Sequence, residues 1–180
     1  MIKPELQALV VVRDSEPADL PAIAAIYGHH VITGFGSFEE DAPGIEELGR
    51  RRADVLERGL PFLVAARKEG GIAGYAYASP FRMRPGYGRC VEDSIYVSPD
   101  ALRSGVGTSL LAELIQRCSA AGYRQLVAVI GDSANAASIA LHGHAGFRRV
   151  GVLQSVAHKR GRWLDAVLMQ RDLREGSSAP

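Results

Sequence analysis

Hydrophobic and polar residues alternate along the chain with two periods, and each period predicts a different kind of element. Short runs rich in β-branched and aromatic residues, bounded by turn-forming residues, predict strands. These runs cover residues 9–13, 61–80, 88–98, 125–131, 147–158 and 163–173. The run 61–80 should be a hairpin that turns at Gly70 and Gly71. Apolar residues three and four positions apart predict helices over 14–31, 44–59, 105–121 and 134–145.

The order of these elements predicts the fold class. One strand, two helices and three strands are followed by helix, strand, helix and two strands, which indicates an α/β chain with a mixed sheet and helices on its faces. The turn-rich segment 32–43 should be a loop. In the second helix we expect Ile45, Leu48, Val55 and Leu56 to face inward and the three arginines mostly outward.

Length, composition and charge narrow the classes of protein. The chain has 180 residues, 47% hydrophobic and 23% charged, so we expect a single domain with a core over about 9–173 and a flexible tail over 174–180. A formal net charge of +1 lacks the basic excess that binds nucleic acid or an anionic membrane, so neither is an expected partner. No apolar run is long enough for a signal peptide or a membrane span, which favours the cytoplasm.

Sulfur chemistry and metal binding are not indicated by the cysteines. Cys90 and Cys118 are too few for a disulfide framework, and no CxxC motif or Cys/His cluster predicts a metal site. Neither cysteine has a histidine at a recognisable spacing, so we expect no acyl group to be carried on sulfur.

The stretch "IYVSPDALRSGVGTSLLAELI", residues 95–115, carries the first chemical signal. A strand gives way to a loop with Gly105 and Gly107, followed at once by an apolar helix, an arrangement that lets the backbone approach a phosphate. A P-loop is excluded because no lysine follows Gly107. A dinucleotide fingerprint lacks its third glycine at Leu110, although Asp132 lies where a ribose-binding acid would lie. A plain loop with two turn glycines and no ligand stays open.

Two motifs together resemble the GCN5-related N-acetyltransferase (GNAT) superfamily. The sequence "LRSGVG" after "YVSP" resembles its pyrophosphate-binding motif, and "NAASIALHGHAGF" resembles the element that follows. The resemblance implies that helix N–H groups bind the pyrophosphate of acetyl-CoA, with no metal. The cofactor-binding residues that it implies are Ile95, Tyr96, Val97, Arg103, Ser104, Gly105, Val106, Gly107, Thr108, Asn135 and Ser138. Leu102 stands where the motif has Gln or Arg, which removes a side-chain contact but not the amides.

A narrower resemblance covers most of the chain, from Val11 to Leu173. "VEDSIYVS", "VAVIGDSANAASIALHGHAGF" and "HKRGRWLDAVLMQRDL" are similar to phosphinothricin and methionine sulfoximine N-acetyltransferases. That family implies a mostly antiparallel sheet of about seven strands with about four helices, a homodimer, and acetyl transfer to the α-amino group of a small amino-acid analogue. Polyamine, aminoglycoside or protein N-terminal acceptors stay open, as does a non-catalytic CoA-binding regulator.

The resemblance also implies catalytic roles. Glu92 would be the base that takes a proton from the attacking amine, directly or through water. Asp93 should point to the other face of the strand. His142 would handle a proton or position the substrate, and Tyr96 would donate to the leaving thiolate or pack in the core. A backbone N–H between Ile95 and Val97 would hold the oxyanion.

Substrate recognition is expected from loops. Arg84 and Tyr87 match family positions near the amino-acid substrate, and a guanidinium suits a carboxylate because it makes two parallel bonds. Phe35 and Phe38, from the loop 32–43, would wall the acceptor pocket. Lys159 belongs to a signature stretch, while Trp163 and Asp165 are expected to be structural or interface residues.

Overall fold

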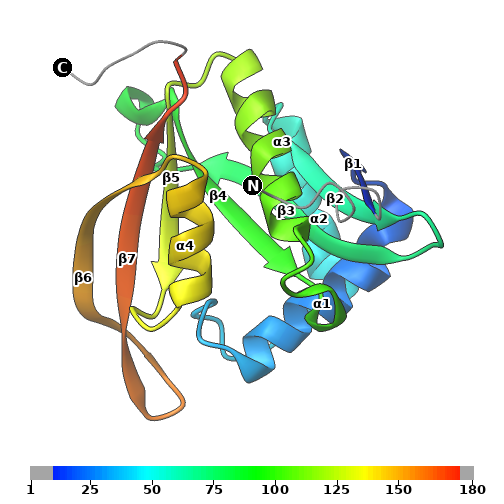
Figure 1. Ribbon diagram of the computed structural model, residues 1–180, viewed down its shortest axis with the longest axis horizontal. Coiled ribbons are helices and arrows are strands. Elements are labelled where there is room, and N and C mark those ends of the chain that lie inside the picture. Colours follow the sequence, from blue (N-terminus) through cyan, green and yellow to red (C-terminus); the bar gives the residue numbers. More distant parts are fainter. Residues whose placement is uncertain (1–9, 175–180) are drawn as a thin grey trace.

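The structure is a computed structural model that describes residues 10–174, and it contains one sheet flanked by helices (Figure 1). The strands are β1 (Val10–Asp14), β2 (Phe62–Arg67), β3 (Ile72–Pro80), β4 (Cys90–Val97), β5 (Gln125–Gly131), β6 (Arg148–Lys159) and β7 (Arg162–Asp172). The α-helices are α1 (Leu20–Thr33), α2 (Ile45–Glu57), α3 (Val106–Ala120) and α4 (Ala136–His144). Short 3-10 turns cover Pro17–Asp19, Pro85–Tyr87 and Pro99–Ala101. The predicted fold class and element order are confirmed; Leu9 and residues 175–180 lie outside the described residues.

The seven strands lie in the order β1-β2-β3-β4-β5-β7-β6. Every neighbouring pair is antiparallel except β4 and β5, which are parallel and joined by the crossover helix α3. Their pairing runs only from Cys90↔Gln125 to Asp93↔Ala128, although β4 continues to Val97 and β5 to Gly131. The ends of these two strands therefore move apart, as Figure 1 shows.

The helices cover both faces of the sheet. Tyr27 of α1 packs edge-on against Tyr96 of β4, which in turn stacks on Tyr75 of β3. The next residue back, Gly74, faces Val106 and Leu110 of α3. Because successive residues of a strand point to opposite faces, α1 and α3 lie on opposite sides of the sheet.

The first two helices differ in detail from the prediction. The α-helical part of α1 begins at Leu20 rather than at residue 14, because Asp14 still pairs with Leu63 in the sheet and a 3-10 turn follows. In α2, Leu48 and Val55 are buried as expected, but Ile45 and Leu56 are 49% and 40% exposed. Arg51 and Arg52, two of the three arginines predicted to point mostly outward, are only partly exposed and bind Glu39 and Ser15.

The contact between Gly74 and α3 gives a stability prediction. A Cβ at position 74 would lie 2.9 Å from the Tyr96 carbonyl oxygen, 3.1 Å from Val106 Cγ1 and 3.2 Å from Leu110 Cδ1. Gly74→Ala is therefore expected to lower the free energy of unfolding by roughly 1–3 kcal/mol, because α3 must shift off the sheet. Urea unfolding measures this, with Gly86→Ala as control because nothing lies within 4 Å of a Cβ there. Equal stability of the two variants would contradict the packing argument.

Candidate active site

A cleft of about 970 Å³ opens where β4 and β5 separate. Its walls come from both strands, from the loop between α1 and α2, from the loop before α3, and from the first turns of α3 and α4. It brings together most of the residues predicted from the sequence: Phe35, Phe38, Glu92, Ile95, Tyr96, Val97, Arg103, Gly105, Val106, Gly107, Thr108, Asn135, Ser138 and His142. A cleft of this size holds a ligand the size of a cofactor.

The loop before α3 is shaped to receive an anion. Arg103 and Gly105 have φ angles of 59° and 83°, and α3 begins directly afterwards at Val106. The first N–H groups of a helix have no acceptor within the helix, so this turn presents donors and the positive end of the helix dipole to the cleft. Among the predicted residues of this loop, Ser104 is the exception, because its hydroxyl donates to the Ala101 carbonyl (2.6 Å) and the residue does not line the cleft.

Gly107 lets the first turn of α3 approach its neighbours closely. A Cβ at this position would lie 3.3 Å from Leu141 Cδ2 of α4 and 3.5 Å from Val97 Cγ2 at the end of β4. Leu102, where the motif has a polar residue, is 57% exposed and lines the same end of the cleft.

Asn135 fixes the opposite wall. Its Oδ1 accepts a hydrogen bond from the Ser138 N–H (3.2 Å), which caps α4, and its Nδ2 donates to the Gly131 carbonyl (3.4 Å) at the end of β5. The side chain therefore joins strand to helix, and both Asn135 and Ser138 face the cleft.

Glu92 lies in the last rows where β4 still pairs with β5, opposite Val127, and its side chain is partly exposed to the cleft. Burial, together with the negative charge of Asp93, raises the pKa of its carboxyl to about 7, although the cation of Arg82 opposes the shift. A carboxyl with this pKa exchanges its proton near neutral pH, as a general base must.

Tyr96 shares the strand face of Glu92 but is packed among aromatic rings. Its ring centroid lies 4.9 Å from that of Tyr27, 5.2 Å from that of Tyr75 and 5.6 Å from that of His30. Burial raises the pKa of its hydroxyl well above 10, so the phenol stays protonated and can act only as a neutral donor or acceptor.

His142 is buried and both of its ring nitrogens are occupied. Nδ1 lies 2.8 Å from the Ser138 carbonyl oxygen and Nε2 lies 2.9 Å from Asp93 Oδ2. A carbonyl can only accept, so Nδ1 carries a hydrogen, and an imidazolium that donates from both nitrogens suits both partners. Burial lowers the pKa of His142, but the hydrogen bond and charge of Asp93 outweigh it, and the net shift is upward.

This pair changes what is expected of His142. Neither nitrogen is free to meet a substrate, so the geometry favours positioning over proton handling. Asp93 points away from Glu92 as predicted, yet sequence reasoning missed that it binds a histidine 49 residues away. The other carboxylate oxygen, Oδ1, is buried without a hydrogen-bond partner among the described residues.

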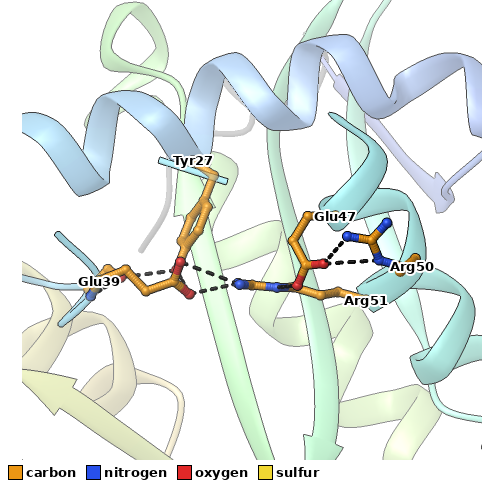
Figure 2. Close-up of polar contacts among 6 residues, drawn as sticks. Tyr27, Glu39, Glu47, Arg50 and Arg51 are labelled. Carbon is orange, nitrogen blue, oxygen red and sulfur yellow. Dashed lines mark hydrogen bonds and ion pairs between the residues drawn. The ribbon is translucent and has the colours of Figure 1, made fainter. Parts of the chain in front are cut away.

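The loop between α1 and α2 is held by a polar network that the sequence did not reveal (Figure 2). The Tyr27 hydroxyl donates to Glu39 (2.9 Å) and contacts the Ser37 hydroxyl (3.0 Å). Arg51 joins α2 to the loop, because its Nη1 donates to Glu39 (2.6 Å). Its Nε donates to Glu47 (2.8 Å) within the same helix. This network fixes the segment that carries Phe35 and Phe38 into the cleft lining.

Arg84 and Tyr87 are not brought to the cleft. They lie in the connection between β3 and β4, at the 3-10 turn Pro85–Tyr87, where both side chains are exposed. The Tyr87 ring contacts Phe81, with 5.9 Å between centroids. Neither residue belongs to the cleft lining of this chain.

Thiols and metal ligands add nothing to the described site. Burial raises the pKa of Cys90 and raises that of Cys118 to about 12, so neither thiol is ionised at neutral pH. Between residues 10 and 174, no three His, Cys, Asp or Glu side chains gather in a way that could hold a metal ion. Over the same stretch, no helix combines the length and apolar character needed to cross a membrane.

A sheet whose strands separate beside a helix N-terminus, with a carboxyl of raised pKa where they separate, is consistent with an acyltransferase site. Residues 24–147 match the family described as the acetyltransferase (GNAT) family, and the chain belongs to that family of enzymes. It is 54% identical over 168 residues to phosphinothricin N-acetyltransferase of Alcaligenes faecalis, covering 93% of this chain and 83% of that protein.

Two further similar proteins belong to the same branch of the family. The L-methionine sulfoximine/L-methionine sulfone acetyltransferase of Pseudomonas aeruginosa strain PAO1 is 41% identical, with 94% of this chain and 98% of that protein covered. A solved GNAT superfamily phosphinothricin acetyltransferase from Sinorhizobium meliloti, in complex with AcCoA, has a TM-score of 0.90 and 44% identity, covering 96% of this chain and 92% of that chain. The predicted superfamily and its narrower branch are thereby confirmed.

The buried Asp93–His142 pair gives a prediction about stability. Asp93→Ala should lower the free energy of unfolding by about 3 kcal/mol, because it leaves a buried imidazolium without its counter-ion. Adding His142→Leu should restore part of the loss, since the uncompensated charge is then removed. Urea unfolding measures both variants, with Asp54→Ala on the exposed side of α2 as control.

The same pair predicts a pH dependence with a defined sign. Because the folded-state pKa of His142 is raised above 6.5, its contribution to stability is complete below that pH and is lost as the pH rises through the folded-state pKa. The difference in stability between wild type and His142→Gln should therefore shrink as the pH rises above about 6.5. A difference that grows with pH would rule out a protonated His142.

Proposed function

We propose that this chain transfers an acetyl group from acetyl-CoA to the α-amino group of a small amino-acid analogue of the phosphinothricin, methionine sulfoximine or methionine sulfone type. The observation that carries the proposal is that one cleft contains both the anion-binding turn before α3 and the raised-pKa carboxyl of Glu92. The acceptors named for the relatives supply the substrate class.

The described residues fit acetyl-CoA along the whole cleft. The backbone N–H groups around residues 103–108 would hold the pyrophosphate, as helix N-termini hold other phosphates. The edge of β4 between Ile95 and Val97, which has lost β5 as its partner, would pair with the pantetheine arm, and Asn135 and Ser138 would line its other side. The Val97 carbonyl oxygen lies 2.8 Å from His30 Nε2, so contacts to the arm fall on the other groups of this edge.

Glu92 would act as the general base. An α-amino group has a pKa near ~7.7–8, so at neutral pH most of it carries a proton that must be removed before attack. The carboxylate of Glu92 accepts that proton, directly or through one water. Acetyl-CoA, when bound, supplies the acetyl group as an activated thioester. Backbone N–H groups between Ile95 and Val97 would stabilise the charge that develops on the acetyl oxygen.

The remaining roles follow from the faces of β4. Tyr96 would donate a hydrogen bond to the departing thiolate and keep its proton, because burial raises the pKa of its hydroxyl well above 10. His142 would act as a positioning residue that holds Asp93, and with it the strand, against α4. Phe35 and Phe38 would wall the acceptor pocket, whereas Arg84 and Tyr87, outside the lining, are not assigned contacts within a single chain.

Homodimerisation is part of the proposal. It rests on the resemblance to the phosphinothricin acetyltransferase branch, and on the exposed apolar side chains Val150, Leu153 and Val156 along the edge strand β6. An edge strand with unpaired backbone groups and apolar side chains is suited to covering by a second copy.

An acceptor panel tests the function. Purified protein is mixed with acetyl-CoA and with phosphinothricin, methionine sulfone, a polyamine, an aminoglycoside or a peptide with a free N-terminus, and thiol release is followed. Turnover with the first two is expected. Turnover only with a polyamine, an aminoglycoside or the peptide would replace the acceptor, and acetyl-CoA binding without any turnover would replace the enzyme with a regulator.

Glu92→Gln is predicted to separate activity from stability. Its kcat/KM should fall by about 10²- to 10⁴-fold, because the base is lost. In wild type the rate should rise with pH through about 7 as the carboxyl ionises, and this limb should disappear in the variant. Because the folded-state pKa of Glu92 is raised above 4.5, ionised Glu92 destabilises the folded state at higher pH. Glu92→Gln should therefore unfold at a higher temperature than wild type at about pH 8.

Glu46→Gln, at an exposed position of α2, is the matched control and should change neither property. A Glu92→Gln enzyme that keeps both its rate and its pH profile would remove Glu92 from the mechanism and leave the acetyl transfer to another base.

A further inference from the structure

Lys159, at the end of β6, is the one lysine side chain among the described residues with no exposed surface. Its Nζ donates to three main-chain carbonyl oxygens, those of Val31 (2.9 Å), Gly34 (3.1 Å) and Ser37 (2.7 Å). An ammonium group has three hydrogens, so all of its donors are used. No carboxylate is among these partners, which is unusual for a buried charge.

The three carbonyls explain how a buried cation is tolerated. Val31 belongs to the last turn of α1, whose carbonyl oxygens have no partner within the helix and form the negative end of its dipole. Gly34 and Ser37 follow in the loop between α1 and α2. Lys159 therefore satisfies the end of α1 and fixes the path of the loop at two further points.

The same loop is confined on its other side by β5. A Cβ at Gly131 would lie 2.6 Å from the Phe35 carbonyl oxygen and 2.9 Å from that of Gly36, so loop and strand are in direct backbone contact. The tip of the hairpin formed by β6 and β7 closes the remaining side. There Arg160 Nη2 donates to the Val31 carbonyl (2.6 Å), and the Arg162 guanidinium lies 4.4 Å from the centre of the Phe35 ring.

Phe35 and Phe38 lie within or beside the segment that these contacts hold. The Ser37 carbonyl accepts a hydrogen bond from Lys159, and the Ser37 hydroxyl contacts the Tyr27 hydroxyl. The residue between Phe35 and Phe38 is therefore fixed through both its main chain and its side chain. Loss of the ammonium would leave carbonyls at 31, 34 and 37 without this donor, and the loop could then move away from β5. The anion-binding turn at residues 103–108 receives no hydrogen bond from Lys159.

We propose that Lys159 is a positioning residue for the acceptor. It holds the loop 34–39 against β5, so acceptor binding depends on it while acetyl-CoA binding does not. The inference rests on the proposed function, in which this loop forms the acceptor wall of the cleft.

The test compares Lys159→Met with Lys68→Met. Methionine keeps most of the apolar stem and removes the charge, and Lys68 is exposed in the turn between β2 and β3. Steady-state kinetics should show the KM for methionine sulfone raised about tenfold or more in Lys159→Met and the KM for acetyl-CoA nearly unchanged. Hydrogen exchange should speed up at the amides of 34–39 but not at those of α3. Lys68→Met should match wild type in all of these measurements.

Other outcomes overturn the inference. If both KM values stay at the wild-type level, or rise together with faster exchange throughout the protein, Lys159 has no specific role in positioning the loop. Should Lys159→Met fail to fold, Arg160→Met loosens the Val31 and Gly34 carbonyls from the exposed side, and a smaller rise in the acceptor KM alone is expected. An unchanged acceptor KM in that variant, together with faster exchange at 34–39, would overturn the proposal, because the loop would then be loosened without effect on the acceptor.

Hydrogen exchange distinguishes failure of the proposed function from failure of the positioning role of Lys159. A wild-type protein that turns over none of the acceptors would defeat the proposed function, yet faster exchange at 34–39 in Lys159→Met would still establish that this lysine holds the loop. Turnover by wild type with no change in Lys159→Met would defeat the positioning role and leave the proposed function intact.

Discussion

The site depends on one constraint in the sheet, which is that β4 and β5 stop pairing after Asp93↔Ala128 while both strands continue. Paired parallel strands satisfy each other's backbone groups, so a separation leaves a strip of donors and acceptors without a partner strand. The cleft lies over this strip. The turn before α3 and Glu92 face the same cleft because the separation of β4 and β5 lies between them.

Where β4 and β5 separate, the alternating side chains of β4 place different groups on the two faces of the sheet. Glu92 and Tyr96 point toward α1 and the loop 34–39, whereas Asp93 points toward α4 and binds His142. One strand therefore carries a carboxyl that exchanges its proton near neutral pH next to a carboxylate neutralised by a buried cation. The negative charge of Asp93 is among the causes that raise the pKa of Glu92, so adjacent positions with opposite orientations remain electrostatically coupled.

Periodic patterns predicted the elements well because they report on local burial. The motif "LRSGVG" located the turn that begins α3, because a positive φ at Gly105 and close packing at Gly107 favour glycine. Contacts between residues far apart in the sequence left no such pattern. Alternation placed Asp93 opposite to Glu92 but could not name His142, and nothing near Lys159 in the sequence points to the end of α1. Arg84 and Tyr87 lie in an irregular connection with no period to orient them. In α2, Arg51 and Arg52 are partly buried because polar partners outside the helix bind them.

The bonds of Lys159 span 122 to 128 residues of the chain. During synthesis, α1 and its following loop leave the ribosome long before the hairpin that holds them exists. Contacts of such wide sequence separation form late, after the entropy of closing a large loop has been overcome. The aromatic wall of the cleft is thus among the first parts of the protein to be made and among the last to take its final place, which ties a working pocket to a complete C-terminal hairpin.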